Sequence, residues 1–250
     1  MKSLTAAELL NAWEQGLNKP LLQKALVLLA AAFPDLHPDT LLKLSIGQRD
    51  LRLLQLRERL FGQRLLNTAV CPVCSQRIEW ENTVADLIVQ SGQNDSTDNE
   101  YVLDTDGYHL RFRLPNSLDI AAAVSADSDI SGAENAERHL LSRCLLRIEH
   151  SGTACDAGQL PDAVIQALVQ QLETLDPQAD IRIRLDCPAC SHNWDVLFDI
   201  AGFLCVEVND WAEQMLRTVY KLASAYGWSE REILGLSPVR RQLYTGMLET

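Results

Sequence analysis

Apolar residues in the first part of the chain recur with helical spacing between short polar breaks. Thr5 and Glu8 form a capping-box pattern, which predicts that a first helix begins there. Residues 21–33 are apolar nearly all round, which predicts a helix buried on most sides. Residues 49–62 place leucines among arginines and end in glycine, as an amphipathic helix does. We therefore expect residues 1–70 to form an N-terminal helical region.

The middle of the chain mixes strand and helix patterns. Residues 108–114, YHLRFRL, and 181–186, IRIRLD, alternate as strands do. Residues 133–148 and 161–175 have helical spacing. Residues 91–100, SGQNDSTDNE, contain no apolar residue and several turn formers, which predicts a loop or linker.

The last fifty residues are again helical in pattern. Apolar residues recur at helical spacing up to Tyr226, more typical of a core than of a partner groove. Ser229 with Glu232 forms another capping box, and Pro238 has the position favoured at a helix start. Residues 201–250 thus predict a C-terminal helical region.

Negative charge is concentrated in one segment. The chain has a formal net charge of −12, and residues 91–180 hold sixteen Asp or Glu against five Arg. We expect this segment to be an acidic subdomain. Its excess of acidic residues indicates either a well-solvated surface or a docking face for a basic partner. A phosphate-binding surface needs the opposite sign.

The phrase CPVCS at residues 71–75 returns as CPACS at residues 187–191. A Cys-x-x-Cys turn presents two thiolates on one side of a tight loop, and two such turns complete a tetrahedral zinc shell. The sequence therefore predicts one structural Zn²⁺ per chain, with the following ligands: Cys71, Cys74, Cys187 and Cys190. Serine follows each turn where glycine would relax a left-handed backbone.

The spacing of these pairs is unusual. Paired turns normally lie about 15–20 residues apart, whereas 112 residues separate Cys74 from Cys187. We expect a zinc ribbon made of residues 71–90 and 181–200 and interrupted by a mixed α/β insertion at residues 91–180. The predicted fold class is α+β, mainly helical with a small antiparallel ribbon.

Other uses of the cysteines are less favoured. A redox dithiol needs only one Cys-x-x-Cys, beside a βαβ pattern, and a catalytic zinc keeps an open coordination position. No nucleophile elbow, phosphate loop, HExxH or Rossmann glycine signature occurs, so the sequence argues against an enzyme. The first residues do not resemble a secretory signal, and the longest apolar run, residues 25–33, is far shorter than the ~20 residues of a membrane span.

The order of several phrases resembles a known family. CPVCSQRIEW, FRLPNSLDIAAA, LDCPACSHNWDVLFDIAGFL and KLASAYGWSEREILGLSPVRRQLY are similar to the baseplate hub assembly chaperone family of T-even-type contractile phages and of phage-tail-like contractile injection systems. The resemblance spans about residues 40–245. Its most particular elements are RLPxSxD at residues 113–119 and the tail phrase AYGWSExEILxLSPxRR at residues 225–241.

The resemblance implies a non-enzymatic assembly chaperone or a structural component of the baseplate or hub. Its partners would be other baseplate or hub proteins, without a small-molecule substrate or membrane insertion, in the cytoplasm or in the assembled particle. Candidate partner-binding residues are Trp228, Arg240 and Arg241. The alternative is a zinc-ribbon regulatory adaptor for nucleic acid or the transcription machinery, which the negative net charge disfavours.

Overall fold

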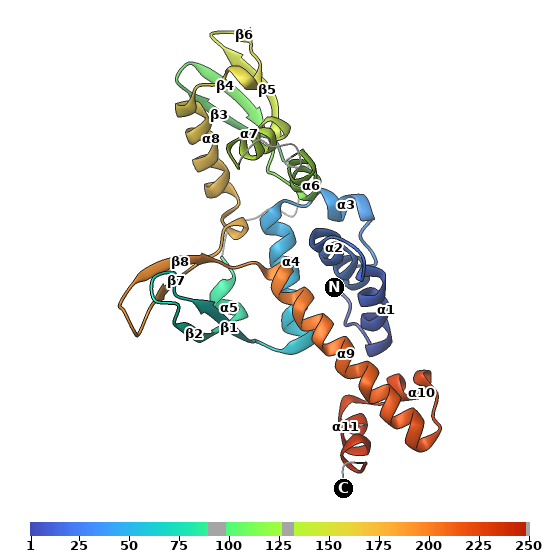
Figure 1. Ribbon diagram of the computed structural model, residues 1–250. Coiled ribbons are helices and arrows are strands. Elements are labelled where there is room, and N and C mark those ends of the chain that lie inside the picture. Colours follow the sequence, from blue (N-terminus) through green and yellow to red (C-terminus); the bar gives the residue numbers. More distant parts are fainter. Residues whose placement is uncertain (90–98, 127–132, 249–250) are drawn as a thin grey trace. The chain divides into compact units, whose positions relative to one another are not determined.

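Residues 1–89, 99–126 and 133–248 are described by the computed structural model (Figure 1). Their contacts group the chain into two compact units, one of Met1–Leu36 with Ile200–Thr250 and one of His37–Asp199. The four-segment organisation expected from the sequence stays a prediction. The expected loop SGQNDSTDNE lies almost entirely outside the described residues.

The first unit is helical throughout its regular elements. These are α1 (Ala6–Gly16), α2 (Leu21–Ala32), α9 (Ile200–Tyr226), α10 (Glu230–Gly235) and α11 (Pro238–Gly246). The predicted capping boxes at Thr5 and Ser229 are confirmed. In each, the hydroxyl accepts a hydrogen bond from the backbone N–H three residues later, and the glutamate side chain at that later position accepts the backbone N–H of the cap residue. Helix α2 packs on α1 and α9, and it buries Ala25, Leu28 and Leu29 there.

The second unit combines helices with short strands. Its elements are α3 (Pro38–Lys43), α4 (Ile46–Phe61), β1 (Arg64–Val70), β2 (Arg77–Thr83), α5 (Val84–Leu87), β3 (Tyr101–Thr105), β4 (Tyr108–Phe112), α6 (Ser117–Ala126), α7 (Ala133–Cys144), β5 (Leu145–His150), β6 (Thr153–Ala154), α8 (Asp162–Leu175), β7 (Arg182–Asp186) and β8 (Asn193–Leu197). In the part of the chain that the structure describes, every strand pairing is antiparallel: β1-β2, β3-β4-β5-β6 and β7-β8.

Two segments predicted as helical are strands. Residues 64–70 follow Gly62, whose positive φ of 90° ends α4, and they pair with β2. Residues 145–148 fall in β5, which hydrogen-bonds to β4, so the predicted helix over residues 133–148 stops at Cys144. In both places a partner strand elsewhere in the chain decides the conformation, which local spacing does not reveal.

Helix α8 covers the four-stranded sheet, as Figure 1 shows. Their shared core includes Leu110 and Phe112 from β4 and Val164 and Leu168 from α8, all 0% exposed. The structure thus confirms a mainly helical α+β class with small antiparallel sheets.

Candidate metal centre

The first Cys-x-x-Cys turn joins β1 to β2. The Cys71 N–H donates to the Gln76 carbonyl at 2.9 Å, and the Ser75 N–H donates to the Cys71 carbonyl at 3.0 Å. Ser75 has a φ of 60°, in the left-handed region. These bonds hold the turn closed, with Cys71 and Cys74 at its two ends.

The second turn, between β7 and β8, repeats this arrangement. The Cys187 N–H donates to the His192 carbonyl at 2.8 Å, and the Ser191 N–H donates to the Cys187 carbonyl at 2.9 Å. Ser191 has a φ of 58°. The repeated five-residue phrase therefore produces the same backbone conformation twice.

The two turns bring four sulfur atoms together. The Sγ atoms of Cys71 and Cys190 lie 3.7 Å apart, those of Cys74 and Cys187 lie 3.5 Å apart, and all four lie within 4.8 Å of one another. A tetrahedral zinc site with Zn–S bonds of about 2.3 Å has S–S edges of about 3.8 Å. The four cysteines predicted from the sequence could therefore hold a metal ion.

The short distances between the sulfur atoms affect the pKa values of the thiols. Burial raises the pKa of Cys187, but the backbone N–H groups of Cys190 and Ala189, with further bonds from neighbouring thiols, outweigh it and lower that pKa to about 7. The His192 N–H lowers the pKa of Cys190, but burial and the adjacent sulfurs raise it to about 12. Four negative sulfurs at these distances repel one another, so a bound cation is what would let them ionise together.

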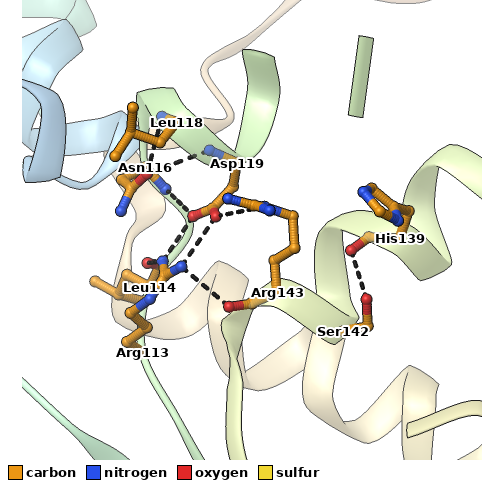
Figure 2. Close-up of polar contacts among 8 residues, drawn as sticks. All are labelled: Arg113, Leu114, Asn116, Leu118, Asp119, His139, Ser142 and Arg143. Carbon is orange, nitrogen blue, oxygen red and sulfur yellow. Dashed lines mark hydrogen bonds and ion pairs between the residues drawn. The ribbon is translucent and has the colours of Figure 1, made fainter. Parts of the chain in front are cut away.

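A second polar centre is formed by the RLPxSxD phrase (Figure 2). Asp119 is completely buried. Arg113 donates two hydrogen bonds to its carboxylate, from Nη1 to Oδ2 at 2.6 Å and from Nη2 to Oδ1 at 2.9 Å. Arg143 from α7 adds a third bond, from Nε to Oδ1 at 3.0 Å. Burial would raise the pKa of Asp119, but these bonds outweigh it and hold the pKa below its usual range.

The same carboxylate caps α6. The Asn116 N–H donates to Asp119 Oδ2 at 3.0 Å, and Asn116 Oδ1 accepts from the N–H groups of Leu118 at 2.9 Å and Asp119 at 3.3 Å. Asn116 is therefore the N-terminal cap of α6. This reciprocal pattern is a capping box, and the spacing Asn-x-x-Asp was the signal in the sequence that could have revealed it.

The network links several elements of the second unit. Arg113 Nη2 donates to the Arg143 carbonyl at 3.0 Å, and the Arg113 N–H donates to the Cys144 carbonyl at 3.0 Å. The Ile46 N–H, at the start of α4, donates to the Pro115 carbonyl at 3.1 Å. In α7 itself, Ser142 Oγ donates to the His139 carbonyl, as Figure 2 also shows. Residues 113–119 therefore connect β4, α4, α6 and α7 through hydrogen bonds.

The candidate partner-binding residues have different surroundings. Arg241 is buried, and its Nη1 donates to the carbonyls of Leu236 at 2.7 Å and Leu234 at 3.0 Å, at the end of α10. Trp228 is half-buried and contacts an aromatic neighbour from α11, whereas Arg240 is exposed. Arg241 thus has a structural role within the chain, and partner binding by the three residues stays a prediction.

Comparison with known families decides the broader identity. The family model described as T4 bacteriophage base plate protein matches residues 7–205. The chain belongs to this family. The matched segment contains the four cysteines and the RLPxSxD phrase but ends within α9, before the tail phrase. No curated protein and no solved structure matches the chain significantly.

Family membership confirms the predicted resemblance to a baseplate protein. It supports a structural or assembly role at a T4-type baseplate, and it implies contact with other baseplate proteins. Among the described residues, no helix is both long and apolar enough to cross a lipid bilayer.

Proposed function

We propose that this protein is a non-enzymatic assembly chaperone or structural component of the baseplate or hub of a contractile tail, stabilised by one Zn²⁺ per chain. The observation that carries the proposal is the four-sulfur cluster, in which two distant hairpins of a baseplate-family chain meet. Other baseplate or hub proteins are its partners, and it acts in the cytoplasm of the producing cell or as part of the particle.

Zinc is the ion that suits this donor set. Four thiolates in a tetrahedral arrangement are typical of structural zinc, and they leave no coordination position open for a substrate or a reactive water. The two hairpins then form one zinc ribbon. For this reason we assign the centre to stability and not to catalysis.

A bound metal ion would join two segments that lie far apart in the sequence. The metal would join residues 71–74 to residues 187–190 and so close a loop that contains β3–β6 and α6–α8. Loop-closure entropy grows only slowly with length, so one metal centre can hold so long a segment at both ends. A rigid surface favours the binding of a large partner, because a surface that must become ordered on binding loses conformational entropy at that step.

The test is to purify sheath-bearing particles from the producing host and to measure this chain in the particles and in soluble complexes by quantitative mass spectrometry. Recovery in finished particles identifies a structural subunit, and recovery only in soluble complexes with baseplate or hub proteins identifies a chaperone. Recovery with neither, and with nucleic acid or polymerase instead, would overturn the proposal in favour of a regulatory adaptor.

A further inference from the structure

The four cysteines of the cluster differ in their exposure to solvent. Cys71 and Cys187, the first cysteines of the two turns, are only 1% and 2% exposed. Cys74 and Cys190, the second cysteines, are exposed. Oxidation of cysteine is selective for accessible sulfur atoms. A dissolved oxidant should therefore react first at the second cysteine of either turn.

Each exposed sulfur lies beside a buried sulfur of the opposite hairpin. Cys74 Sγ is 3.5 Å from Cys187 Sγ, and Cys190 Sγ is 3.7 Å from Cys71 Sγ. A disulfide bond is about 2.05 Å long, so each pair has to close by roughly 1.5–1.7 Å. The cluster therefore contains two pairs in which an accessible sulfur has a second sulfur from the other hairpin within reach.

We propose that peroxide converts the zinc centre into two disulfides between the hairpins, Cys74–Cys187 and Cys71–Cys190, and that the hairpins stay joined after the metal has left. This inference rests on the proposed function, which supplies the bound Zn²⁺. Thiolates persist in the reducing cytoplasm, whereas disulfides form and persist outside it. For a chain that leaves the producing cell within a particle, the same four residues provide the link in both environments.

The oxidation begins at an exposed cysteine such as Cys74. Its thiolate attacks hydrogen peroxide, so that an S–O bond forms, the O–O bond breaks and the hydroxide that leaves is protonated to water. The Cys187 thiolate then attacks the oxidised sulfur, so that the S–S bond forms, the S–O bond breaks and a second water leaves. Cys190 and Cys71 react in the same way. In total, four thiolates lose four electrons, and two molecules of peroxide with four protons become four molecules of water.

Release of the metal follows from the number of ligands. A disulfide sulfur carries no negative charge, so only two thiolates remain after the first disulfide has formed, whereas structural zinc sites use four ligands. Zinc leaves as Zn²⁺, without a change in its oxidation state.

The pairing decides whether the hairpins stay joined. Cys71 and Cys190 are 119 positions apart, and Cys74 and Cys187 are 113 positions apart, so either disulfide closes nearly the same loop as the metal. A disulfide within one turn would leave the hairpins unlinked. Because the stabilisation by a disulfide increases with the length of the loop that it closes, pairing between the hairpins keeps the constraint on the unfolded chain.

The test uses the purified full chain, with zinc measured by elemental analysis before and after treatment with hydrogen peroxide. Digestion with trypsin without reduction leaves Cys71 and Cys74 on residues 65–77, and Cys187 and Cys190 on residues 185–217. We expect peroxide to release the zinc and to join these two peptides. Fragmentation in the mass spectrometer should assign the pairs as Cys74–Cys187 and Cys71–Cys190.

The variant Cys190→Ser separates the two possible pairings of Cys74. It leaves Cys187 in the other hairpin and Cys71 in the same turn, and we expect the disulfide Cys74–Cys187. Cys155→Ser, which changes a half-buried cysteine outside the cluster, is the matched control and should form both disulfides. If Cys190→Ser does not fold, the pairing in the wild type decides by itself.

Thermal denaturation tests whether the link is retained. We expect the oxidised chain without zinc to melt at least about 5 °C above the reduced chain stripped of zinc, because its two long-range disulfides restrict the unfolded state. Dithiothreitol should abolish the difference.

Three results would overturn the inference: disulfides confined within each turn, zinc retained in peroxide, or oxidation of the cluster to sulfinic acid instead of disulfides. If zinc is bound before oxidation and any of these is found, only this inference fails. A purified chain without zinc would remove the metal from the proposed function and this inference with it, whereas the location of the chain in particles or hub complexes is tested separately.

Discussion

Ser75 and Ser191 lie in different hairpins and share a left-handed backbone, with φ of 60° and 58°. Each directly follows the second cysteine of its turn and donates its N–H to the carbonyl of the first. A residue with a Cβ atom pays about 1–2 kcal/mol in this conformation. The turns therefore keep serine at a position where glycine would fit without strain.

Replacing either serine with glycine should stabilise the protein. We expect Ser75→Gly and Ser191→Gly each to raise the free energy of unfolding by about 0.5–1 kcal/mol, since relief of strain exceeds the added entropy of the unfolded chain. Urea denaturation measures the change. Ser224→Gly, at an exposed position within α9, is the matched control and should destabilise by about 0.5 kcal/mol. Equal effects at all three positions would contradict the strain argument.

Loss of one cysteine of the cluster should remove the metal. We expect Cys187→Ser to reduce bound zinc from one per chain to none and to lower the melting temperature by more than about 5 °C, because metal binding contributes directly to folding. Elemental analysis and thermal denaturation measure both effects. Cys155→Ser, at a half-buried cysteine outside the cluster, should keep the zinc. A Cys187→Ser variant with full zinc and unchanged stability would disprove the metal centre.

Removal of the buried carboxylate should be costly. We expect Asp119→Asn to destabilise the protein by about 2–3 kcal/mol at pH 7, less than a fully buried pair, because Arg113 and Arg143 are 28% and 38% exposed. Asp162→Asn breaks a comparable bond to Arg138, but Asp162 is 83% exposed, so the loss should stay below about 1 kcal/mol. Equal losses at the two sites would argue against the network.

The cost of Asp119→Asn should also depend on pH. The pKa of Asp119 is lowered in the folded state, so its stabilisation is complete above the unfolded pKa of about 3.9 and disappears as the pH falls through the lower folded value. The difference between wild type and variant should therefore shrink below about pH 4. Chemical denaturation between pH 3 and pH 7 measures it, and a constant difference would show that the charge of Asp119 contributes nothing.

Gly47, at the start of α4, lies so close to Asp176 that a larger residue there should destabilise the protein. A Cβ atom on Gly47 would lie 2.0 Å from Oδ1 of Asp176, which also accepts the Gly47 N–H through Oδ2 at 2.9 Å. We expect Gly47→Ala to destabilise by about 1–3 kcal/mol, as overpacking does. Gly235→Ala, with no atom within 4 Å of its Cβ position, should change stability by less than about 0.5 kcal/mol. Denaturation curves of the two variants decide the point.

Local features of this protein were predictable from its sequence because they depend on residues a few positions apart. The capping boxes at Thr5 and Ser229, the strand β7 before the second Cys-x-x-Cys turn and the left-handed position after each turn are such features. The pairing of the four cysteines was also predictable, because one short phrase occurs twice with ligand spacing.

Tertiary structure alone decided the rest, because those features depend on partners distant in sequence. Residues 64–70 and 145–148 are strands only because another strand bonds to them. Arg113 and Arg143 meet at Asp119 only after β4, α6 and α7 have packed. The burial of Arg241 likewise follows from the way α11 docks on α10 and Trp228, which helical periodicity could not specify.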